Sequence, residues 1–336
     1  DEAMAAAELV YLSQQDVIDA SPSLGETIGI IEDVFAEHGA GRVVNPPKPA
    51  VHPLPDAFIH AMPGHLTGRR QVGLKWISGF FSNAAKGLPS LSGLIVLNDA
   101  QTGFPTAVMD AAYITALRTA AASGVAAKYL ARPDSTTLGI VGAGLQGRYN
   151  LLALKEVLPK LSRVRLFDTR PDTVAKFAAD MAAPAKVEIV PAASAQEAIA
   201  GADVAITATG WLDKPIFLAD WLGAGQLVLP IHSRGWERAA IDRADKFVVD
   251  DWGQFHTSMT GHGGFYRELP EPYAQLGEIV AGAKAGRESD EELIIDFNYG
   301  LAIHDVAVGH EVLARAKAAG IGRALPQLDG QFPYAP

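Results

Sequence analysis

The sequence feature that most constrains the fold is the stretch TTLGIVGAGLQGRYNLLALKEV, residues 136–157. It opens with a short apolar run rich in β-branched side chains, which is too short for a buried helix and is typical of a parallel strand. The glycine-rich segment 142–147 follows at once. Behind it, apolar residues recur at helical spacing at Leu151, Leu152, Leu154, Val157 and Leu158. The stretch therefore predicts a strand, a tight glycine turn and a helix.

A second apolar run at 164–167 ends at Asp168, about 20 residues beyond the last glycine, which is the spacing of a Rossmann dinucleotide-binding turn. In that turn the first glycine makes the bend, the second lets a pyrophosphate approach the backbone, and the third lets helix and strand pack closely. The free N–H groups at the helix N-terminus favour phosphate binding. The predicted cofactor contacts in the turn are Gly142, Gly144, Leu145, Gln146 and Gly147. The alternative is a structural glycine loop in another α/β fold.

Asp168 also indicates which dinucleotide binds. A carboxylate at the end of the second strand accepts hydrogen bonds from both ribose hydroxyls and repels a 2′-phosphate, so we predict NAD rather than NADP. Arg170 is positioned to pair with such a phosphate, but we interpret it as a solvated turn residue. The remaining predicted cofactor contacts are Thr169, Thr207, Ala208 and Thr209, the last three in the strand-like run ADVAITATG.

Length and composition limit the remaining choices. A chain of 336 residues is about right for two domains. A formal net charge of −10 without a basic run argues against a nucleic-acid partner. The absence of cysteine excludes disulfides, thiolate catalysis and cysteine-ligated zinc. No apolar run approaches membrane-spanning length, and the start DEAMAAAEL lacks the basic segment of a signal peptide, so we expect a cytoplasmic protein with no membrane partner.

The order of predicted elements places the dinucleotide fold in the second half of the chain. Residues 8–40 predict a short strand and a helix, and the proline-rich segment 43–56 predicts an edge strand or extended loop. Four strand-like runs lie between 57 and 110, followed by a helix that ends before Pro133. From 136 to about 300, strands and helices alternate, and a long alanine-rich helix closes the chain. We therefore predict an α/β protein in which an α+β domain comes first and the dinucleotide-binding domain follows it.

Several stretches resemble the ornithine cyclodeaminase/μ-crystallin family and follow its order along nearly the whole chain. They are MPGHL, VGLKWIS, LNDAQTGFPTAVMDAAYITALRTAAASGVAAKYLA, GIVGAGLQGRYNLLAL and GEIVAGAKAGRESDEELIIDFNYGLAIHDVAV. The resemblance implies a two-domain NAD(P) enzyme whose α+β domain, completed by the last helix, binds substrate and forms a homodimer. It implies that a Rossmann domain, residues 131–304, is inserted into this α+β domain of residues 1–130 plus 305–336. Its members include cyclodeaminases, alanine dehydrogenases and imine reductases, which share hydride exchange at the α-carbon of an amino or imino acid.

The resemblance also assigns residues that hold the substrate's α-carboxylate: Lys48, Lys75 and Arg118, with Lys75 and Arg118 as the catalytic pair. A carboxylate that leaves water requires converging charged donors. Lys75 would also contact the imine nitrogen or relay a proton to it, and Thr119 would face the cofactor phosphates. Lys75 interrupts an apolar run, where an unpaired lysine would be costly, whereas a solvated loop lysine is an equal alternative for Lys48.

One departure from the family pattern bears on the substrate. After the run QLVLP the family continues as G-A-D-x-P-G-K, whereas this chain continues as IHSRGWERAAI, which puts Arg234 in the place of the aspartate. A guanidinium there repels a cationic side chain and favours a second carboxylate. We therefore predict that Arg234, with His232 or Ser233, binds the distal carboxylate; the alternative is a loop arginine that swings into solvent.

Weaker candidates complete the list. His65 replaces a family tyrosine and is assigned to the substrate pocket, and His256, His262 and Tyr266 lie in a glycine-rich stretch that would suit a mobile flap. For Asp305, capping or packing is as plausible as a catalytic role. The histidines show no metal-binding spacing, so we predict no metal.

The predicted function is NAD-dependent reduction of a small imino acid by hydride transfer to the imine carbon, with an iminosuccinate-reducing member of the family favoured. The alternatives are an ornithine-type cyclodeaminase, an alanine dehydrogenase-like or other imine reductase, and a non-catalytic dinucleotide-binding protein of the μ-crystallin kind. The expected partners are a small imino or amino acid and a second copy of the chain.

Overall fold

The structure is a computed structural model that describes residues 8–261 and 263–327. The chain separates into two compact units. Unit 1 comprises residues 1–22, 43–115 and 302–336, and unit 2 comprises residues 23–42 and 116–301. His262 and residues 1–7 and 328–336, on which parts of the sequence analysis fall, lie outside the described residues.

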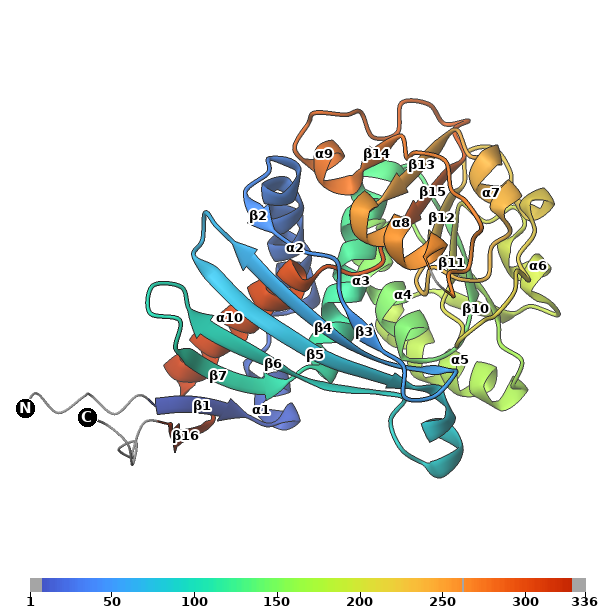
Figure 1. Cartoon of the computed structure of the whole chain (residues 1–336). Helices are drawn as coiled ribbons and strands as arrows, with labels where there is room; N and C mark the ends of the chain where they lie inside the picture. The colour runs from blue at the N-terminus through green and yellow to red at the C-terminus, as the bar shows by residue number, and fades with distance from the viewer. Residues whose placement is uncertain (1–7, 262, 328–336) are drawn as a thin grey trace, which may run out of the picture. The chain divides into compact units, whose positions relative to one another are not determined.

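Unit 1 is built on a mostly antiparallel sheet in the order β16-β1-β7-β6-β5-β4-β2, with β3 also paired to β4 (Figure 1). Only β1 and β7 pair in parallel within the described residues of this sheet. Its strands are β1 (Glu8–Leu12), β2 (Val43–Val44), β3 (Ala50–Val51), β4 (Ala57–Leu66), β5 (Gln71–Phe80), β6 (Leu91–Asp99), β7 (Pro105–Asp110) and β16 (Arg323–Pro326). A 3₁₀ helix, η1 (Phe81–Lys86), connects β5 toward β6. The prolines of segment 43–56 limit β2 and β3 to two residues each, as their missing N–H groups dictate.

Two helices cover one face of this sheet. The long α10 (Ala302–Ala319) lies across β4, β5 and β6, and α1 (Gln14–Ala20) packs against α10 and β7 (Figure 1). Gly64 permits the close approach of α10, because a Cβ there would lie 3.0 Å from the backbone nitrogen of Ile303. The face of β5 that carries Gly73, Lys75 and Ile77 is therefore the buried one, since alternate residues of a strand point to the same side.

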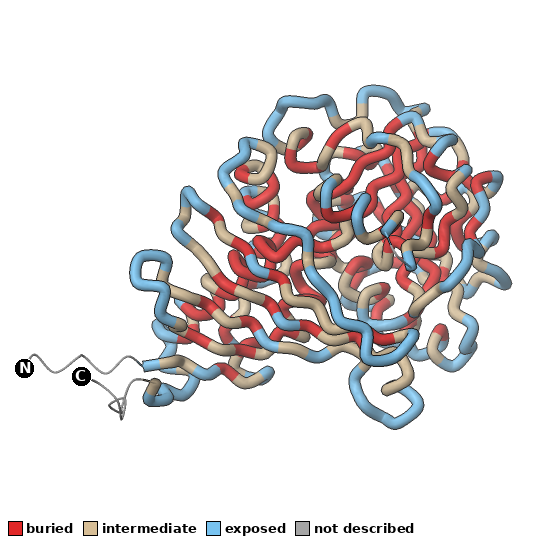
Figure 2. Tube along the Cα trace, viewed as in Figure 1, coloured by how far each residue is buried: buried red, intermediate tan, exposed pale blue. Residues whose placement is uncertain are grey.

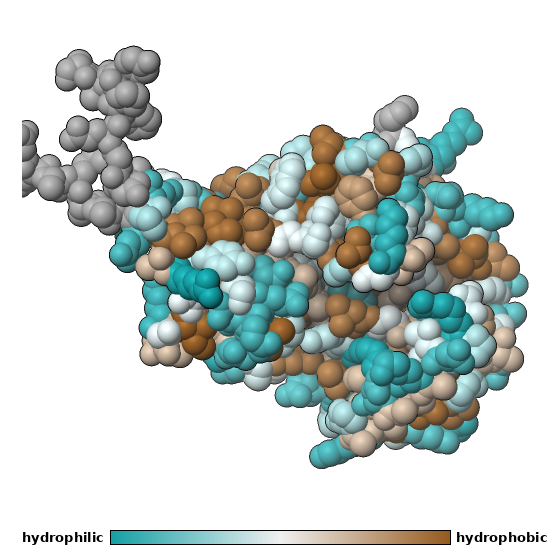
Figure 3. Space-filling view, turned by 90° about the horizontal axis from the view of Figure 1, so that it is seen from below, coloured by the Kyte–Doolittle hydropathy of each residue, from teal (hydrophilic) through white to brown (hydrophobic). Residues whose placement is uncertain are grey.

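The opposite face of the unit 1 sheet carries apolar residues at its surface. Trp76 and Leu94 are paired across β5 and β6 and are 46% and 44% exposed, and Tyr11 of β1 is exposed as well. A space-filling view of one side of the molecule shows apolar side chains at the surface as brown areas between hydrophilic ones (Figure 3). A sheet face of this kind is typical of a surface that another protein chain covers.

Unit 2 contains a parallel sheet in the order β10-β9-β8-β11-β12-β15-β13-β14. Every pairing that the structure describes in it is parallel. Its strands are β8 (Thr137–Val141), β9 (Arg163–Phe167), β10 (Glu188–Pro191), β11 (Val204–Thr207), β12 (Leu227–Pro230), β13 (Lys246–Val249), β14 (Ala274–Gln275) and β15 (Ile294–Phe297). The order reverses between β8 and β11, and a doubly wound sheet binds its ligands at the carboxyl ends of the strands near such a point. The fold class predicted from the sequence is confirmed.

Helices surround this sheet, and its central strands are fully buried, as the red segments of Figure 2 show. α4 packs against α5 and α2, whereas α6 lies against β8 and β9. The helical elements of unit 2 are α2 (Leu24–Gly39), most of α3 (Ala112–Leu130), α4 (Leu145–Val157), α5 (Pro171–Ala185), α6 (Ala195–Ile199), η2 (Ala219–Trp221), α7 (Arg238–Arg243), α8 (Trp252–Thr260) and α9 (Leu276–Val280). Both-sided burial explains why the strands are continuous apolar runs instead of alternating ones.

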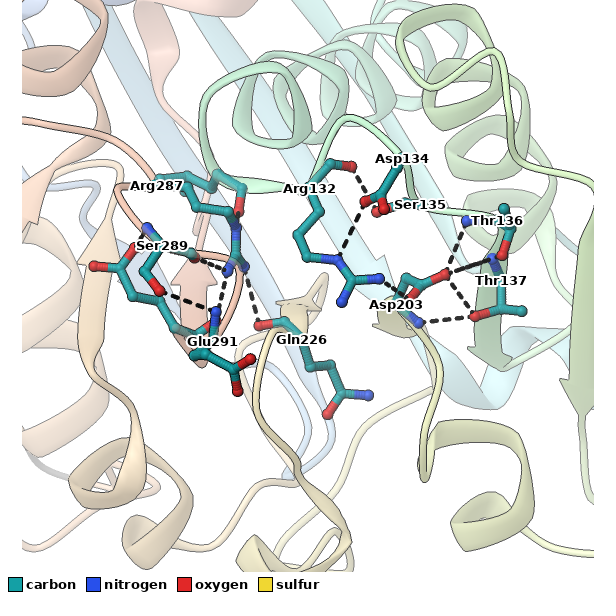
Figure 4. A network of polar contacts seen from close by, with 12 residues as sticks. Arg132, Asp134, Ser135, Thr136, Thr137, Asp203, Gln226, Arg287, Ser289 and Glu291 are labelled. Carbon is teal, nitrogen blue, oxygen red and sulfur yellow. Dashed lines mark hydrogen bonds and ion pairs between the residues drawn. The ribbon is translucent and has the colours of Figure 1, made fainter.

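A polar network ties together the amino ends of the unit 2 strands. Asp203, just before β11, accepts hydrogen bonds from the backbone N–H groups of Thr136 and Thr137 and forms a 2.7 Å ion pair with Arg132 (Figure 4). Arg287 donates to backbone carbonyls nearby, among them that of Gln226. These contacts lie at the edge of the sheet opposite to the carboxyl ends of the strands, so they stabilise the fold.

The compact units differ from the predicted domains at three segments. Residues 23–42 and 116–130 group with the dinucleotide-binding unit, and residues 302–304 group with unit 1. Residues 23–42 do so because α2 packs against α4 and α9. The capping box between Ser23 and Glu26 fixes the start of α2. The sequence analysis did not identify α1 or β15 as separate elements.

Candidate active site

The glycine turn between β8 and α4 has the geometry that a dinucleotide requires. Gly142 has a φ of +109°, and a Cβ at this position would overlap the carbonyl oxygen of Ala208. A Cβ at Gly147 would overlap the carbonyl oxygen of Gly142, whereas a Cβ at Gly144 would meet no atom within 4 Å. Gly144 therefore faces open space at the N-cap of α4, where Leu145 and Gln146 offer free N–H groups to an anion.

Asp168 follows β9 and lies beside this turn. Its Oδ2 accepts a 2.9 Å hydrogen bond from the Ala143 N–H, and its Oδ1 accepts one of 3.0 Å from the Arg170 N–H. The Arg170 side chain is 70% exposed and its Nε lies 3.5 Å from Asp168 Oδ1, so Arg170 is a solvated turn residue that contacts the carboxylate weakly. Thr169 is exposed. The carboxylate is thus fixed next to the glycine turn, as the NAD prediction requires.

The other predicted cofactor residues lie in two places. Thr207 and Ala208 are buried at the carboxyl end of β11, and Thr209 is half-buried just beyond it. The Thr207 hydroxyl accepts a 3.2 Å hydrogen bond from the indole N–H of Trp236, so this side chain is already engaged within the fold. Thr119 is half-buried on α3.

The loop after β12 carries His232, Ser233 and Arg234. His232 is half-buried, and burial lowers its pKa to about 4, so its imidazole is neutral at physiological pH. Ser233 has a φ of +58°, is fully buried, and its hydroxyl has no hydrogen-bond partner in the part of the chain that the structure describes. Such strain in a non-glycine residue is concentrated at functional sites.

Arg234 does not extend freely into solvent. Its guanidinium lies over the Trp211 ring, 4.0 Å from the centroid, and over Phe265 at 5.5 Å. Burial lowers the pKa of Arg234, but a guanidinium keeps its charge at physiological pH. Within residues 8–261 and 263–327, no carboxylate lies within the 4.0 Å of an ion pair with Arg234. The loop therefore presents a held cation at the carboxyl edge of the sheet.

A second group at this edge was not found from the sequence. Gly300, after β15, has a φ of +100°; its N–H donates a 2.6 Å hydrogen bond to Asp250, and its carbonyl accepts one of 3.0 Å from Gln254. A Cβ at Gly300 would lie 2.8 Å from Nη1 of Arg118, so the buried Arg118 guanidinium lies directly against this backbone. The available signal was an acidic residue directly after the apolar run KFVV, where parallel strands place their functional side chains.

Asp250 has a carboxyl neighbour. Asp296, in β15, is buried, accepts a 2.7 Å hydrogen bond from the Asn298 amide, and has a pKa raised to about 8 by burial and by the charge of Asp250. Asp296 is therefore mostly protonated at neutral pH.

In unit 1, Lys75 is completely buried and forms a 2.7 Å ion pair with Asp305 of α10. Its Nζ also lies 3.5 Å from the Thr115 hydroxyl. The sequence left two roles open for Asp305, capping or packing on the one hand and catalysis on the other. In the structure Asp305 directly contacts Lys75, a candidate catalytic residue. The carboxylate holds the ammonium in place within the low-dielectric interior.

The charges of Lys48 and Lys75 both lower the pKa of one histidine, His60. His60 of β4 has its pKa lowered to about 3, first by burial and then by the charges of Lys48, Lys75 and His52. Lys48 is half-buried between β2 and β3. Unit 1 thus concentrates positive charge around His60, a residue that the sequence analysis did not single out.

The structure does not place His65 on the same side of the sheet as Lys75. His65 pairs with Val72 across β4 and β5, and Met62 pairs with Lys75 in the same register. Because successive side chains of a strand point to opposite faces, His65 lies on the opposite face of the sheet from Lys75.

The sequence profile of the ornithine cyclodeaminase/mu-crystallin family matches residues 8–320. The chain belongs to this family. It is 41% identical over 312 residues to a nodulation efficiency protein, NfeD, of Rhizobium meliloti, a match that covers 93% of this chain and 97% of the relative.

Solved structures of the family agree in fold. The Thermococcus litoralis Δ1-pyrroline-2-carboxylate reductase in complex with NADH and L-proline is similar with a TM-score of 0.85 and 33% identity, covering 94% of this chain and all of that one. An archaeal alanine dehydrogenase dimer with bound NAD has a TM-score of 0.82 and 34% identity, covering 95% of this chain and 99% of that one. The family predicted from the sequence is thus confirmed.

Three other candidates fall outside this picture. His256 lies next to Trp252, with ring centroids 4.8 Å apart, and Tyr266 donates its hydroxyl to the Trp236 carbonyl, so both are part of the packing around α8. His262 is not among the described residues. Over the described ranges, no three acidic, histidine or cysteine side chains are placed to hold a metal ion, and no helix is long and apolar enough to cross a bilayer.

Proposed function

We propose that this chain reduces the imine of a small dicarboxylic imino acid to the amino acid, with iminosuccinate to aspartate as the favoured reaction. The coarser activity is that of the family, NAD-dependent oxidoreduction at the carbon–nitrogen bond of amino or imino acids. The Gly142–Gly147 turn and Asp168 would hold the cofactor, whose reduced form, NADH, would supply a hydride when bound. The protein supplies orientation and charge.

Lys75, Arg118 and Lys48 are proposed to bind the α-carboxylate. Support comes from the burial of Lys75 and Arg118, since charged groups are retained in an interior where a ligand or partner offsets their desolvation, whereas Lys48 is half-buried. Asp305 keeps the Lys75 ammonium fixed, and an ammonium at that position can hydrogen-bond the imine nitrogen or donate a proton to it.

The observation that carries the dicarboxylate proposal is Arg234. It is half-buried and held by two aromatic rings, and although the charge of Asp213 acts on it, no carboxylate of the described residues lies within ion-pair distance of it. A cation in that state attracts an anionic ligand group and repels the ammonium of an ornithine-like side chain. This favours a reductase of dicarboxylic imines over an ornithine cyclodeaminase. The buried Lys75–Asp305 pair is a feature that a passive dinucleotide-binding protein does not require.

The test compares two imines. Arg234→Ala should cost about 2–5 kcal/mol in transition-state binding of the imine formed from oxaloacetate and ammonia, the scale for removing one partner of a buried charge pair. The imine of pyruvate and ammonia has no distal carboxylate and should lose far less. Lys75→Ala should impair both, because both carry the α-carboxylate. An unchanged ratio in Arg234→Ala, or a wild type that prefers the monocarboxylic imine, would remove the dicarboxylate assignment.

We also propose that the chain forms a homodimer through the outer face of the unit 1 sheet. The exposed Trp76 and Leu94 lie at the centre of that face, and the alanine dehydrogenase structure similar to this chain is a dimer. Large exposed apolar side chains on a flat sheet favour a self-complementary contact.

A further inference from the structure

Arg234 is held by residues from two separate segments. Trp211 comes from the loop after β11, and Phe265 comes from the stretch after α8. Both rings are half-buried, and the Arg234 guanidinium carbon lies 4.0 Å from the Trp211 centroid and 5.5 Å from that of Phe265. At these distances each ring attracts the cation through its negative face. We refer to Trp211 and Phe265 as the arginine clamp.

The clamp is itself fixed in orientation. The Trp211 indole N–H donates a 2.7 Å hydrogen bond to Asp213, which sets the plane of the ring that contacts Arg234. Phe265 lies edge-on to Tyr266, whose hydroxyl donates a 3.0 Å hydrogen bond to the Trp236 carbonyl. Each ring thus has a contact other than Arg234 that holds it, which favours a preorganised clamp.

The backbone around Arg234 is also constrained. Ser233 has a φ of +58° and Gly235 a φ of +112°, and a Cβ at Gly235 would lie 2.6 Å from the Phe217 ring. Residues in such conformations persist only where the surrounding structure fixes them. The backbone of Arg234 is therefore constrained as well as its guanidinium.

The guanidinium retains hydrogen-bonding capacity. Its Nη1 and Nη2 lie 3.5 Å from the Leu212 carbonyl and 3.4 Å from that of Gly263, both long for N–H···O hydrogen bonds. A guanidinium has five donors in one plane, and a ring stacked on it covers its flat face while leaving the in-plane donors available. That geometry suits a carboxylate bound side-on by two parallel hydrogen bonds.

From these contacts we propose that Trp211 and Phe265 are specificity-determining positioning residues, which fix the reach of Arg234 so that it selects dicarboxylic imines by chain length. The proposal rests on the proposed function and deepens it. A mobile arginine follows distal carboxylates at several distances, whereas a clamped one meets only a carboxylate at one distance from the Arg118 guanidinium of the same unit. The enzyme should therefore separate four-carbon from five-carbon dicarboxylic imines, and this separation should depend on the clamp.

The experiment uses Trp211→Leu, Phe265→Leu and Trp211→Phe in the full chain. For each, kcat/KM is measured with NADH and ammonia plus oxaloacetate, 2-oxoglutarate or pyruvate. Trp211→Leu should lower the oxaloacetate value about 3- to 30-fold, the range that corresponds to loss of a partly desolvated cation–π contact. The pyruvate value should change less than about twofold, since no distal carboxylate is involved, and the oxaloacetate to 2-oxoglutarate ratio should move toward one.

Two further variants separate the clamp from general packing. Trp211→Phe keeps a ring over the guanidinium and should retain most of the chain-length preference. Trp252→Leu is the matched control, because this tryptophan of the same unit contacts Phe247 and His256 and neither Arg234 nor Phe217, and it should leave both substrate ratios unchanged.

The outcomes distinguish the two proposals. If Arg234→Ala abolishes the dicarboxylate preference while both leucine variants of the clamp retain it, the clamp is refuted and the proposed function stands. If the leucine variants lower all three substrates equally, the rings serve packing and the clamp is likewise refuted. If Arg234→Ala leaves the oxaloacetate to pyruvate ratio unchanged, the proposed function itself fails.

Discussion

Lys75 on β5 and Asp305 on α10 form a buried ion pair, with Nζ and Oδ2 2.7 Å apart and neither side chain more than 1% exposed. Two charges removed from water are costly unless each neutralises the other. A nonpolar pair would suit the core between β5 and α10 equally well, so the retention of a charged pair indicates a role for the ammonium. The Lys75–Asp305 pair therefore bears both on the stability of unit 1 and on the substrate binding proposed for Lys75.

The pair makes stability and activity separable. Lys75→Ala removes the cation from a buried carboxylate and should cost about 3–5 kcal/mol of unfolding free energy, the scale for breaking a buried pair. The double variant Lys75→Met with Asp305→Leu should recover most of that loss in urea unfolding, because no buried charge of the pair remains. Its imine reduction should stay at background. Recovery of activity together with stability would show that the pair is structural only.

The cofactor preference should follow Asp168. The wild type should use NADH in preference to NADPH, because the fixed carboxylate beside the glycine turn repels a 2′-phosphate. Asp168→Ser should narrow the ratio of the two kcat/KM values, whereas Arg170→Ala should leave NADH preferred, since that side chain is solvated. A wild type that prefers NADPH would mean that Arg170 determines the choice.

Two glycines of the turn should respond in opposite ways to alanine. Gly142→Ala should destabilise unit 2, because its φ is +109° and the new Cβ would overlap the Ala208 carbonyl. Gly144→Ala meets no protein atom within 4 Å and should leave the thermal midpoint nearly unchanged, while weakening NADH binding by filling the space at the N-cap of α4. Thermal unfolding and NADH fluorescence titration of both variants test this, and equal NADH affinity in Gly144→Ala and wild type would contradict it.

The proposed dimer depends on the outer face of the unit 1 sheet. Trp76→Glu places a charge among the exposed apolar residues of β5 and β6 and should shift the protein from dimer to monomer in sedimentation at micromolar concentration. Leu145→Glu is a control at another exposed apolar residue, one that lies in unit 2, and should leave the sedimentation coefficient unchanged. A wild type that is monomeric throughout this concentration range would refute the dimer.

The elements predicted well from sequence are those whose pattern is local. The glycine turn, the apolar strands of unit 2 and the capped helix 24–39 each follow from residues within a short window. Helix α1 was missed because its seven residues are too few to show a helical repeat of apolar side chains, although Ser13 and Asp16 form a capping box at its start. β15 was missed because three apolar residues and Asp296 inside an acidic stretch do not indicate that the strand lies between β12 and β13.

The sequence identified single residues of the candidate site but not the contacts that these residues make. Lys75, Arg118 and Arg234 were identified, but their partners come from distant segments: Asp305, Gly300 and the arginine clamp. Such contacts depend on strand order and register, which no local pattern contains. The same register places His65 on the far face from Lys75, and an alternation argument could not exclude it before the pairing of β4 and β5 was known.

Asp296 should make the stability of unit 2 fall as the pH rises. Its pKa is raised from the ordinary 3.8 to about 8, by burial and by Asp250, so between these values the native state binds a proton that the unfolded state has lost. The unfolding free energy contributed by this group is fully present below pH 3.8 and is lost progressively as the pH rises to about 8. Asp296→Asn is neutral at every pH and close in shape to the protonated acid. Its thermal midpoint relative to the wild type should therefore rise steadily from pH 5 to pH 8 and then level off.

The matched control for this measurement is Asp250→Asn, which removes the like charge. It should lower the pKa of Asp296 and move the loss of stability to lower pH, although Asp250 also accepts the Gly300 N–H and its removal has a cost of its own. The pH at which the curve levels off is therefore the quantity to compare, because the lost hydrogen bond displaces the whole curve without changing that pH. If the Asp296→Asn and wild-type curves run parallel from pH 5 to pH 9, Asp296 is ionised in the native state and its burial is compensated by contacts other than the Asn298 amide.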